Sequence, residues 1–326
     1  MDTIIRDYLL GLNVEEPQRH KNMSVFPLLT QLNGGPDYTT LKDALEKALL
    51  SVTEVSSGGS VPELKVVNTA GISVLLLDGE ELAGAKQNRV LNTTILIKEK
   101  SETVIPVSCT EQRRWSYASK AFQDSDTVMS PKLRVEKART VSTSLSSTGQ
   151  YRSDQGTVWQ KIDEQAAKAG TVSQTGAMKD TFVQKAAELD EYLKAFRHIP
   201  EQKGLLVFIG GEPVGFDFIS KDSAFGLLYP KLIRSYAMEA VLEEKKDGAK
   251  PDRKQAEEFL KEAAECEEKK YDSIGRGNDF RYEGKTVVGS ALAVDGKVVH
   301  MAFFRVSEAD KTGEMARTRH RIKFRL

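Results

Sequence analysis

The sequence predicts an α+β fold, with a mixed, mainly antiparallel sheet built from both ends of the chain and a helical middle segment. Short runs rich in β-branched residues occupy 64–107 and return at 205–218 and 287–306. Residues 116–200 are mostly polar or helical in pattern, with few strand signals. Because strands and helices are grouped rather than strictly alternating, an α+β arrangement is expected within a single domain over 1–326.

Apolar residues at helical spacing predict helices at 39–51, 177–196, 222–243 and 252–269. Pro230 falls inside the third helix, so a break is expected there, because proline lacks the amide hydrogen and clashes with the preceding turn.

The segment 140–156, TVSTSLSSTGQYRSDQG, is rich in serine and threonine and has few apolar residues to bury. It is therefore predicted to be a mobile loop.

Three segments share one form, with apolar residues, a glycine-containing turn and an apolar return: 74–84, 206–215 and 291–300. Asp78-Gly79 is the turn of the first segment, and glycine accepts a positive φ there at no steric cost. Three hairpins of similar build explain the likeness, and internal duplication is the alternative.

Composition limits the classes of function. Lys plus Arg and Asp plus Glu are both 47 in the 326 residues, so the formal net charge is zero. Nucleic-acid binding is not expected, since it needs a basic surplus that displaces counterions. Two cysteines cannot form a disulfide framework or a four-cysteine zinc site, and the four histidines are scattered, so no metal is expected.

No apolar run approaches the length of a membrane span, and the first residues lack a secretory pattern, so a cytoplasmic protein is expected. The glycine-rich dinucleotide and P-loop motifs are absent, as are H-E-x-x-H, C-x-x-C and G-x-S-x-G. The sequence therefore gives no support for a standard dinucleotide or P-loop site, or for the zinc-protease, dithiol or serine-hydrolase motifs.

The densest polar cluster is DGEELAGAKQNRVLN, at 78–92, between two apolar runs. Its amide, carboxylate and guanidinium groups suit a ligand with phosphate or ribose hydroxyls, and Arg89 can bind phosphate bidentately. The alternative is a solvated hairpin tip with surface salt bridges.

A second cluster, VSCTEQRRW, ends the next strand at 107–115. Polar loops beyond strand ends often hold ligands. Cys109 is either a nucleophile beside arginine or a buried structural thiol, and Glu111 is the better candidate for a general base. Trp115 can stack on a base or pack in the core.

Two further features are ambiguous. Asp217 is a charge within an apolar run, so it needs a partner or solvent, and Lys231, Ser235 and Tyr236 follow on the next helix. The last strand predicted, 317–326, carries cations at every second residue. It is either a nucleic-acid surface or a charged edge strand that prevents aggregation.

The segments LLLDGEELAGAKQNRVLNTTILI and IPVSCTEQRRW resemble the signature segments of the ARPP-1 domain family, the ARG and rhodanese-phosphatase-superfamily-associated proteins. QGTVWQKID, the segment from Gly204 to Val241 and VVGSALAVDGKVVHMAFF resemble later blocks of that family. The resemblance covers most of 20–306 and leaves the basic tail at 307–326 outside it.

The resemblance implies an association with ADP-ribosylglycohydrolases and phosphatase-like proteins in NAD or ADP-ribose metabolism, and it supplies no catalytic residues. Its matching residues coincide with the two polar clusters, which are therefore expected to form one pocket for an ADP-ribose-like or other nucleotide-derived ligand. Glu81 or Glu111 would be the acid or base of any hydrolysis. The residues expected to bind the ligand are Gln87, Asn88, Arg89, Asn92, Gln112, Arg114 and Trp115.

The competing hypothesis is a nonenzymatic interaction or regulatory domain in which these clusters are internal networks that support hairpins. No cofactor and no protein partner can be named from the sequence.

Overall fold

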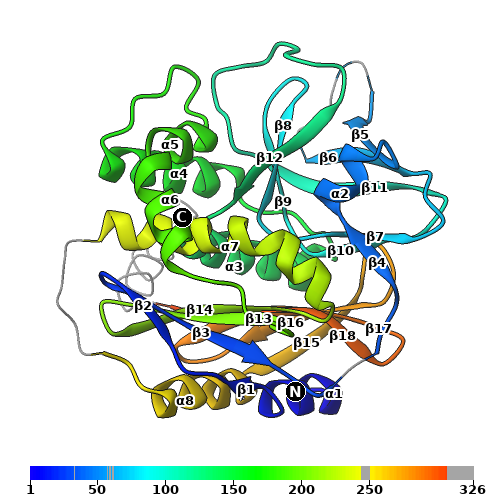
Figure 1. The fold of residues 1–326 in the computed structure, drawn as a ribbon. Coiled ribbons are helices and arrows are strands. Elements are labelled where there is room, and N and C mark those ends of the chain that lie inside the picture. The colour runs from blue at the N-terminus through cyan, green and yellow to red at the C-terminus, as the bar shows by residue number, and fades with distance from the viewer. Residues whose placement is uncertain (33, 57, 59, 61, 244–249, 307–326) are drawn as a thin grey trace, which may run out of the picture.

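The computed structural model describes residues 1–32, 34–56, 58, 60, 62–243 and 250–306. The predicted strand at 317–326 lies outside the described residues. In the described part, strands form three sheets and helices cover them (Figure 1).

The largest sheet has nine strands in the order β1-β3-β13-β14-β18-β17-β16-β15, with β2 beside β3. Strands from both ends of the chain meet in it, since β3 pairs with β13 and β14 pairs with β18. Its strands are β1 (Asn13–Val14), β2 (Gln18–His20), β3 (Met23–Leu29), β13 (Gly204–Ile209), β14 (Glu212–Ile219), β15 (Glu267–Asp272), β16 (Asn278–Glu283), β17 (Val287–Val294) and β18 (Lys297–Arg305).

Helices cover both faces of this sheet (Figure 1). The helices α1 (Thr3–Leu10) and α8 (Arg253–Ala264) lie on one face, and α3 (Pro131–Thr148) and α7 (Asp222–Leu242) lie on the other. Every residue of β13 is buried, because Leu206 and Phe208 pack toward α1 and α8 while Leu205 and Val207 pack toward α3 and α7. Two-sided burial explains why this strand is continuously apolar.

Two smaller sheets lie above α3 and α7 in Figure 1, with a core of their own. The six-stranded sheet has the order β12-β8-β9-β11-β6-β5 and the three-stranded sheet has the order β10-β7-β4. The ladder between β4 and β7 is parallel. The strands are β4 (Tyr38–Thr40), β5 (Leu50–Glu54), β6 (Glu63–Asn68), β7 (Ser73–Leu76), β8 (Glu80–Gly84), β9 (Arg89–Leu91), β10 (Ile95–Ile97), β11 (Ser101–Cys109) and β12 (Phe122–Val128).

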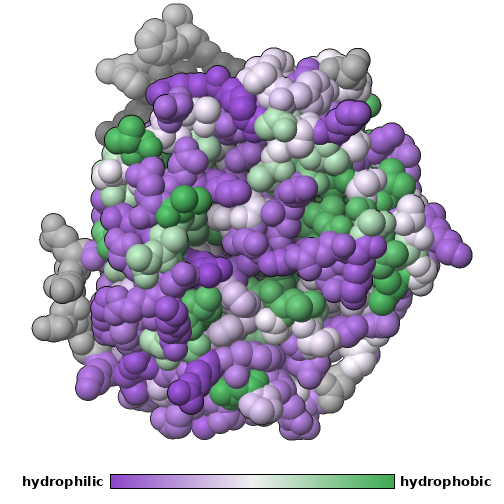
Figure 2. All heavy atoms as spheres, turned by 45° about the horizontal axis from the view of Figure 1, so that its top comes forward, coloured by the Kyte–Doolittle hydropathy of each residue, from purple (hydrophilic) through white to green (hydrophobic). Residues whose placement is uncertain are grey.

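The remaining helices are α2 (Leu41–Glu46), α4 (Gln155–Ala169), α5 (Met178–Gln184) and α6 (Ala186–Ala195). The consecutive helices α3, α4, α5 and α6 form the helical middle segment, so the predicted α+β class is confirmed. None of the described helices is both long and apolar enough to cross a membrane. Figure 2 shows a mainly hydrophilic face, with hydrophobic residues gathered on the side of the two smaller sheets.

The prediction of a loop over 140–156 is wrong for residues 140–148, which are the second half of α3. Val141 and Leu145 are buried and pack with Tyr151. The hydroxyl groups of Thr143 and Ser147 form hydrogen bonds within the helix. Each donates to the backbone carbonyl four residues earlier, at 3.0 and 2.9 Å. A narrow apolar stripe with local hydroxyl bonds therefore suffices for a helix here.

The break predicted at Pro230 is also wrong, since α7 is continuous from Asp222 to Leu242. An internal proline costs a helix about 3 kcal/mol. Neighbouring residues on several sides of α7 are buried, among them Leu228, Tyr229, Leu232 and Ile233. Their packing offsets that cost.

Two of the three predicted hairpins are confirmed, β13–β14 and β17–β18. The first is wrong, because β7 pairs with β4 and β10 whereas β8 pairs with β9 and β12. The turn at Asp78-Gly79 thus carries the chain from one sheet to another. The helices predicted at 39–51 and 252–269 end earlier, at Glu46 and Ala264, and strands follow them.

Candidate functional site

The two polar clusters predicted from the sequence are neighbours in space. β9 pairs with β11, which places Arg89 opposite Cys109. Beyond the paired strands, the Thr110 amide donates to the Asn88 carbonyl at 3.0 Å. The segments around Asn88 and Gln112 therefore form adjoining parts of one surface region.

Arg114 and Glu111 form the centre of this region. Arg114 donates to Glu111 through Nε at 2.9 Å and through Nη2 at 2.6 Å. Its Nη1 donates to the Ala85 carbonyl at 2.7 Å, and the Asn88 amide donates to Glu111 at 3.1 Å. These groups pair with one another and hold the loop after β11 against the turn between β8 and β9.

Charge pairing dominates the ionisation of Glu111. Burial by itself would raise its pKa, but the hydrogen bonds from Arg114 and from the Asn88 amide lower the pKa below its ordinary value. Glu111 is therefore an ionised carboxylate at neutral pH and a poor proton donor.

Arg89 lies fully buried beneath Trp115, whose ring centroid is 5.8 Å from the guanidinium carbon. Its Nη1 donates to the Gln87 carbonyl at 3.2 Å. Its Nη2 lies 3.7 Å from Glu54, and within the described structure Nε and Nη2 have no hydrogen-bond partner. Trp115 is half exposed, so it covers the arginine and leaves one face to solvent.

The other predicted residues are distributed around this centre. Gln87 donates to the Gln112 carbonyl at 3.3 Å, and Gln112 donates to Asp163 at 3.0 Å. Asn92 lies deeper, where it donates to the Tyr151 carbonyl at 3.0 Å and accepts from Ser108 at 2.7 Å.

Glu81 and Cys109 are both buried. Thr110 donates to Glu81 at 2.5 Å, and burial raises the pKa of Glu81 to about 7. Burial likewise raises the pKa of Cys109 to about 11, so this thiol is protonated at neutral pH, as expected of a buried structural cysteine.

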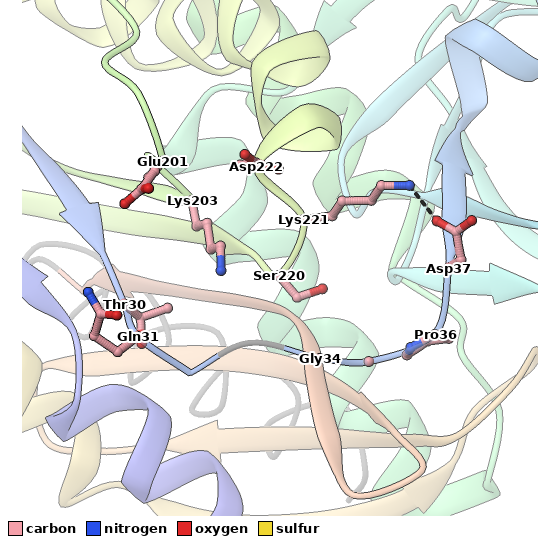
Figure 3. Close-up of a pocket in the computed structure, with 11 residues that line it drawn as sticks. Thr30, Gln31, Gly34, Pro36, Asp37, Glu201, Lys203, Ser220, Lys221 and Asp222 are labelled. Atoms are coloured by element: carbon pink, nitrogen blue, oxygen red, sulfur yellow. Dashed lines mark hydrogen bonds and ion pairs between the residues drawn. The ribbon is translucent and has the colours of Figure 1, made fainter.

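A separate hollow lies elsewhere, where three distant segments meet (Figure 3). Its volume is about 470 Å³. It is lined by Thr30, Gln31, Gly34, Gly35, Pro36, Asp37, Glu201, Lys203, Ser220, Lys221 and Asp222. None of the nine predicted site residues lines it or the smaller hollow beside it.

Strand and helix ends position the polar side chains of this hollow. Lys203 precedes β13 and points toward the segment around Thr30, and Ser220 and Lys221 join β14 to α7 (Figure 3). Lys221 donates to Asp37 at 2.5 Å and to the Tyr38 carbonyl at 3.1 Å. Gly34 and Gly35 have φ of 95° and 137°, a backbone that only glycine adopts readily.

Comparison with known families settles the relationship of the chain. The model of the ARG and Rhodanese-Phosphatase-superfamily-associated Protein domain, ARPP-1, matches residues 11–304. The chain belongs to the ARPP-1 family. Searches of curated proteins and of solved structures gave no match.

The ARPP-1 match contains both the predicted clusters and the hollow. Sequence reasoning missed the hollow, because Lys203, Ser220 and Lys221 belong to no dense polar cluster. The available signal was their position, since each lies where a buried strand begins or ends.

Asp217 has the partner that the sequence required. Arg134 donates to both of its carboxylate oxygens, at 2.9 and 2.7 Å, and Tyr236 donates at 2.9 Å. Burial would raise the pKa of Asp217, but Arg134 and His300 hold it well below the ordinary value. Lys231 pairs instead with Glu80 at 2.8 Å.

Both Asp217 and Arg134 are inaccessible to solvent, so this cluster is an internal network. Elsewhere in the described chain too, no three histidine, cysteine, aspartate or glutamate side chains are grouped to hold a metal ion.

Proposed function

We propose that this ARPP-1 protein binds a phosphate-bearing, nucleotide-derived ligand of the ADP-ribose type in the large hollow. The observation that carries the proposal is the volume of about 470 Å³ with two lysines in its lining. Ligand pockets in proteins usually measure about 300–1,000 Å³. The hollow is thus large enough for such a ligand and has cations for its phosphates.

The remaining lining groups suit a ribose. Glu201 and Asp222 provide carboxylates that accept hydrogen bonds from hydroxyls, and Ser220 can donate or accept. Gly34 and Gly35 have no side chains, which lets a ligand approach the backbone. Because the lining carries three acids and two lysines, a ligand with both hydroxyls and phosphate fits better than phosphate alone.

The site predicted around Arg89 and Arg114 stays a second candidate for the ligand. Its exposed aromatic ring at Trp115 favours it, whereas the mutual pairing of Arg114 and Glu111 favours an internal network. That pairing also supports the alternative function, a nonenzymatic interaction domain whose polar clusters support its loops.

Calorimetry with ADP-ribose tests the proposal. Lys203→Ala should weaken binding about tenfold or more, because a hydrogen bond to a charged group contributes roughly 1.5–3 kcal/mol. Lys261→Ala, on the exposed side of α8, is the control and should leave binding unchanged.

The arms of this experiment separate the hypotheses. Weaker binding in Arg89→Ala but not in Lys203→Ala would place the ligand in the sequence-predicted cluster, provided that circular dichroism shows a folded variant. No heat with the unaltered protein would favour the interaction domain. Analysis of the ligand after incubation shows whether binding leads to hydrolysis.

A further inference from the structure

A second, smaller hollow adjoins the large one. Its volume is about 240 Å³, and Lys221 lines both hollows. Tyr38 and Ser220 separate them, since the Tyr38 hydroxyl lies 2.8 Å from the Ser220 hydroxyl and each residue lines a different hollow. A molecule that occupied both hollows would pass the ammonium group of Lys221.

The two linings differ in chemistry. The smaller hollow has apolar side chains from Leu49, Ile72, Ala224 and Leu227 beside its hydroxyl and charged groups, whereas the larger one has no leucine, isoleucine or alanine in its lining. The carboxylate of Asp43, held by Thr39 at 2.6 Å and Lys47 at 2.9 Å, adds a hydrogen-bond acceptor to the smaller hollow. Aliphatic side chains beside a carboxylate acceptor suit a flat heterocycle that carries N–H donors.

We infer that the ligand is a two-part molecule, with a nucleobase in the smaller hollow, a diphosphate beside Lys221 and a terminal sugar in the larger hollow. The inference rests on the proposed function and specifies its ligand class. Because the smaller hollow is below the usual size of a complete ligand pocket, it fits one part of a ligand rather than the whole.

Lys221 can exchange its ion pair with Asp37 for a diphosphate at little cost in free energy. Its partner Asp37 has a side chain that is 73% exposed, and exposed ion pairs stabilise proteins by only about 0–1 kcal/mol. A diphosphate can therefore replace Asp37 at the ammonium group. Asp37→Asn should strengthen ADP-ribose binding a few-fold, since it removes both the competitor and a repelling charge.

Calorimetry with ribose 5-phosphate, AMP and ADP-ribose tests the assignment. Leu227→Asp should weaken AMP and ADP-ribose about tenfold and leave ribose 5-phosphate unchanged, because only the first two carry a base. Leu227 is 53% exposed, so the substitution is compatible with folding. Val183→Asp, at a similarly exposed helical position (61%), is the matched control.

The measurements distinguish failure of the two-part ligand assignment from failure of the proposed binding function. If Leu227→Asp weakens all three ligands equally or none of them, while Lys203→Ala still weakens ADP-ribose, the two-part assignment is overturned and the binding function stands. If Lys203→Ala weakens none of them, the proposed function and the assignment both fall.

Discussion

The pKa values of two buried carboxyl groups near Thr110, those of Glu81 and Glu111, shift in opposite directions. Glu81 accepts from Thr110, and its environment raises the pKa to about 7. Glu111 is also largely buried, but Arg114 beside it makes the net shift downward. Burial thus dominates at Glu81, whereas the hydrogen bonds from Arg114 and the Asn88 amide outweigh burial at Glu111.

Glu81→Gln should stabilise the protein at pH 8 and change little at pH 4. The folded protein retains a proton on Glu81 that the unfolded chain loses near pH 4.5, so stability falls as the pH rises from about 4.5 to about 7. Glutamine removes that loss, which amounts to about 3 kcal/mol for a rise of the pKa from 4.5 to about 7. Urea unfolding at both pH values measures it, and an equal effect at pH 4 and pH 8 would contradict the explanation.

Arg114→Ala should destabilise the protein by about 2 kcal/mol at pH 7, because it leaves the buried Glu111 carboxylate without its cation. Since the folded pKa of Glu111 lies below 4.5, this stabilisation is complete above about pH 4.5 and is lost as the pH falls through the folded pKa. Urea unfolding at pH 7 and pH 3.5 checks the difference. The neighbouring exposed residue provides a control, Arg113→Ala, which should have little effect at either pH.

At the scale of elements, α3 connects the layers through charged side chains. Arg134 bonds Asp217 on β14 and lies 3.5 Å from Asp78 in the turn between β7 and β8. Lys137, one turn later, pairs with Asp78 and donates to the Leu91 carbonyl at 2.7 Å. The large sheet, the helix and the smaller sheets thus share one ionic network.

Arg134→Met should lower the free energy of unfolding by about 3–5 kcal/mol, because Asp217 would stay buried without a cation. Combining it with Asp217→Asn should restore part of the loss, since no unpaired charge then remains. Thermal unfolding of the single and double variants measures the coupling. Thr143→Ala, on the exposed side of α3, should change stability by no more than about 0.5 kcal/mol.

At the scale of the whole molecule, the spacing of apolar residues predicted where helices and strands occur. It was less successful for the residues at which they end and for the strands with which they pair. Buried strands such as β13 and, apart from Ser290, β17 carry few polar residues, so they were recognisable from the sequence. The helix over 140–148 was missed because its apolar stripe is narrow, and the continuity of α7 at Pro230 depends on packing from other elements. The stability of both helical stretches therefore depends on contacts with residues outside the stretch itself.

The adjacency of Asn88 and Gln112 was predicted, and it arises because the two segments flank the paired strands β9 and β11, which are close in the chain although β10 lies between them. The pairing of Arg114 with Glu111 was not, because residue type does not specify whether a charge faces a ligand or another side chain. Their role as a ligand site stays a prediction.

The sequence by itself determined the fold class, the family and the proximity of two polar segments, because these depend on local periodicity and on short connections. Only the tertiary structure decided which charges are buried together and where a hollow opens. The large hollow joins residues near 34, 202 and 221, and the network joins Asp78, Arg134 and Asp217. Both arise from long-range packing, in which the cost of burying a charge is offset by partners distant in the chain.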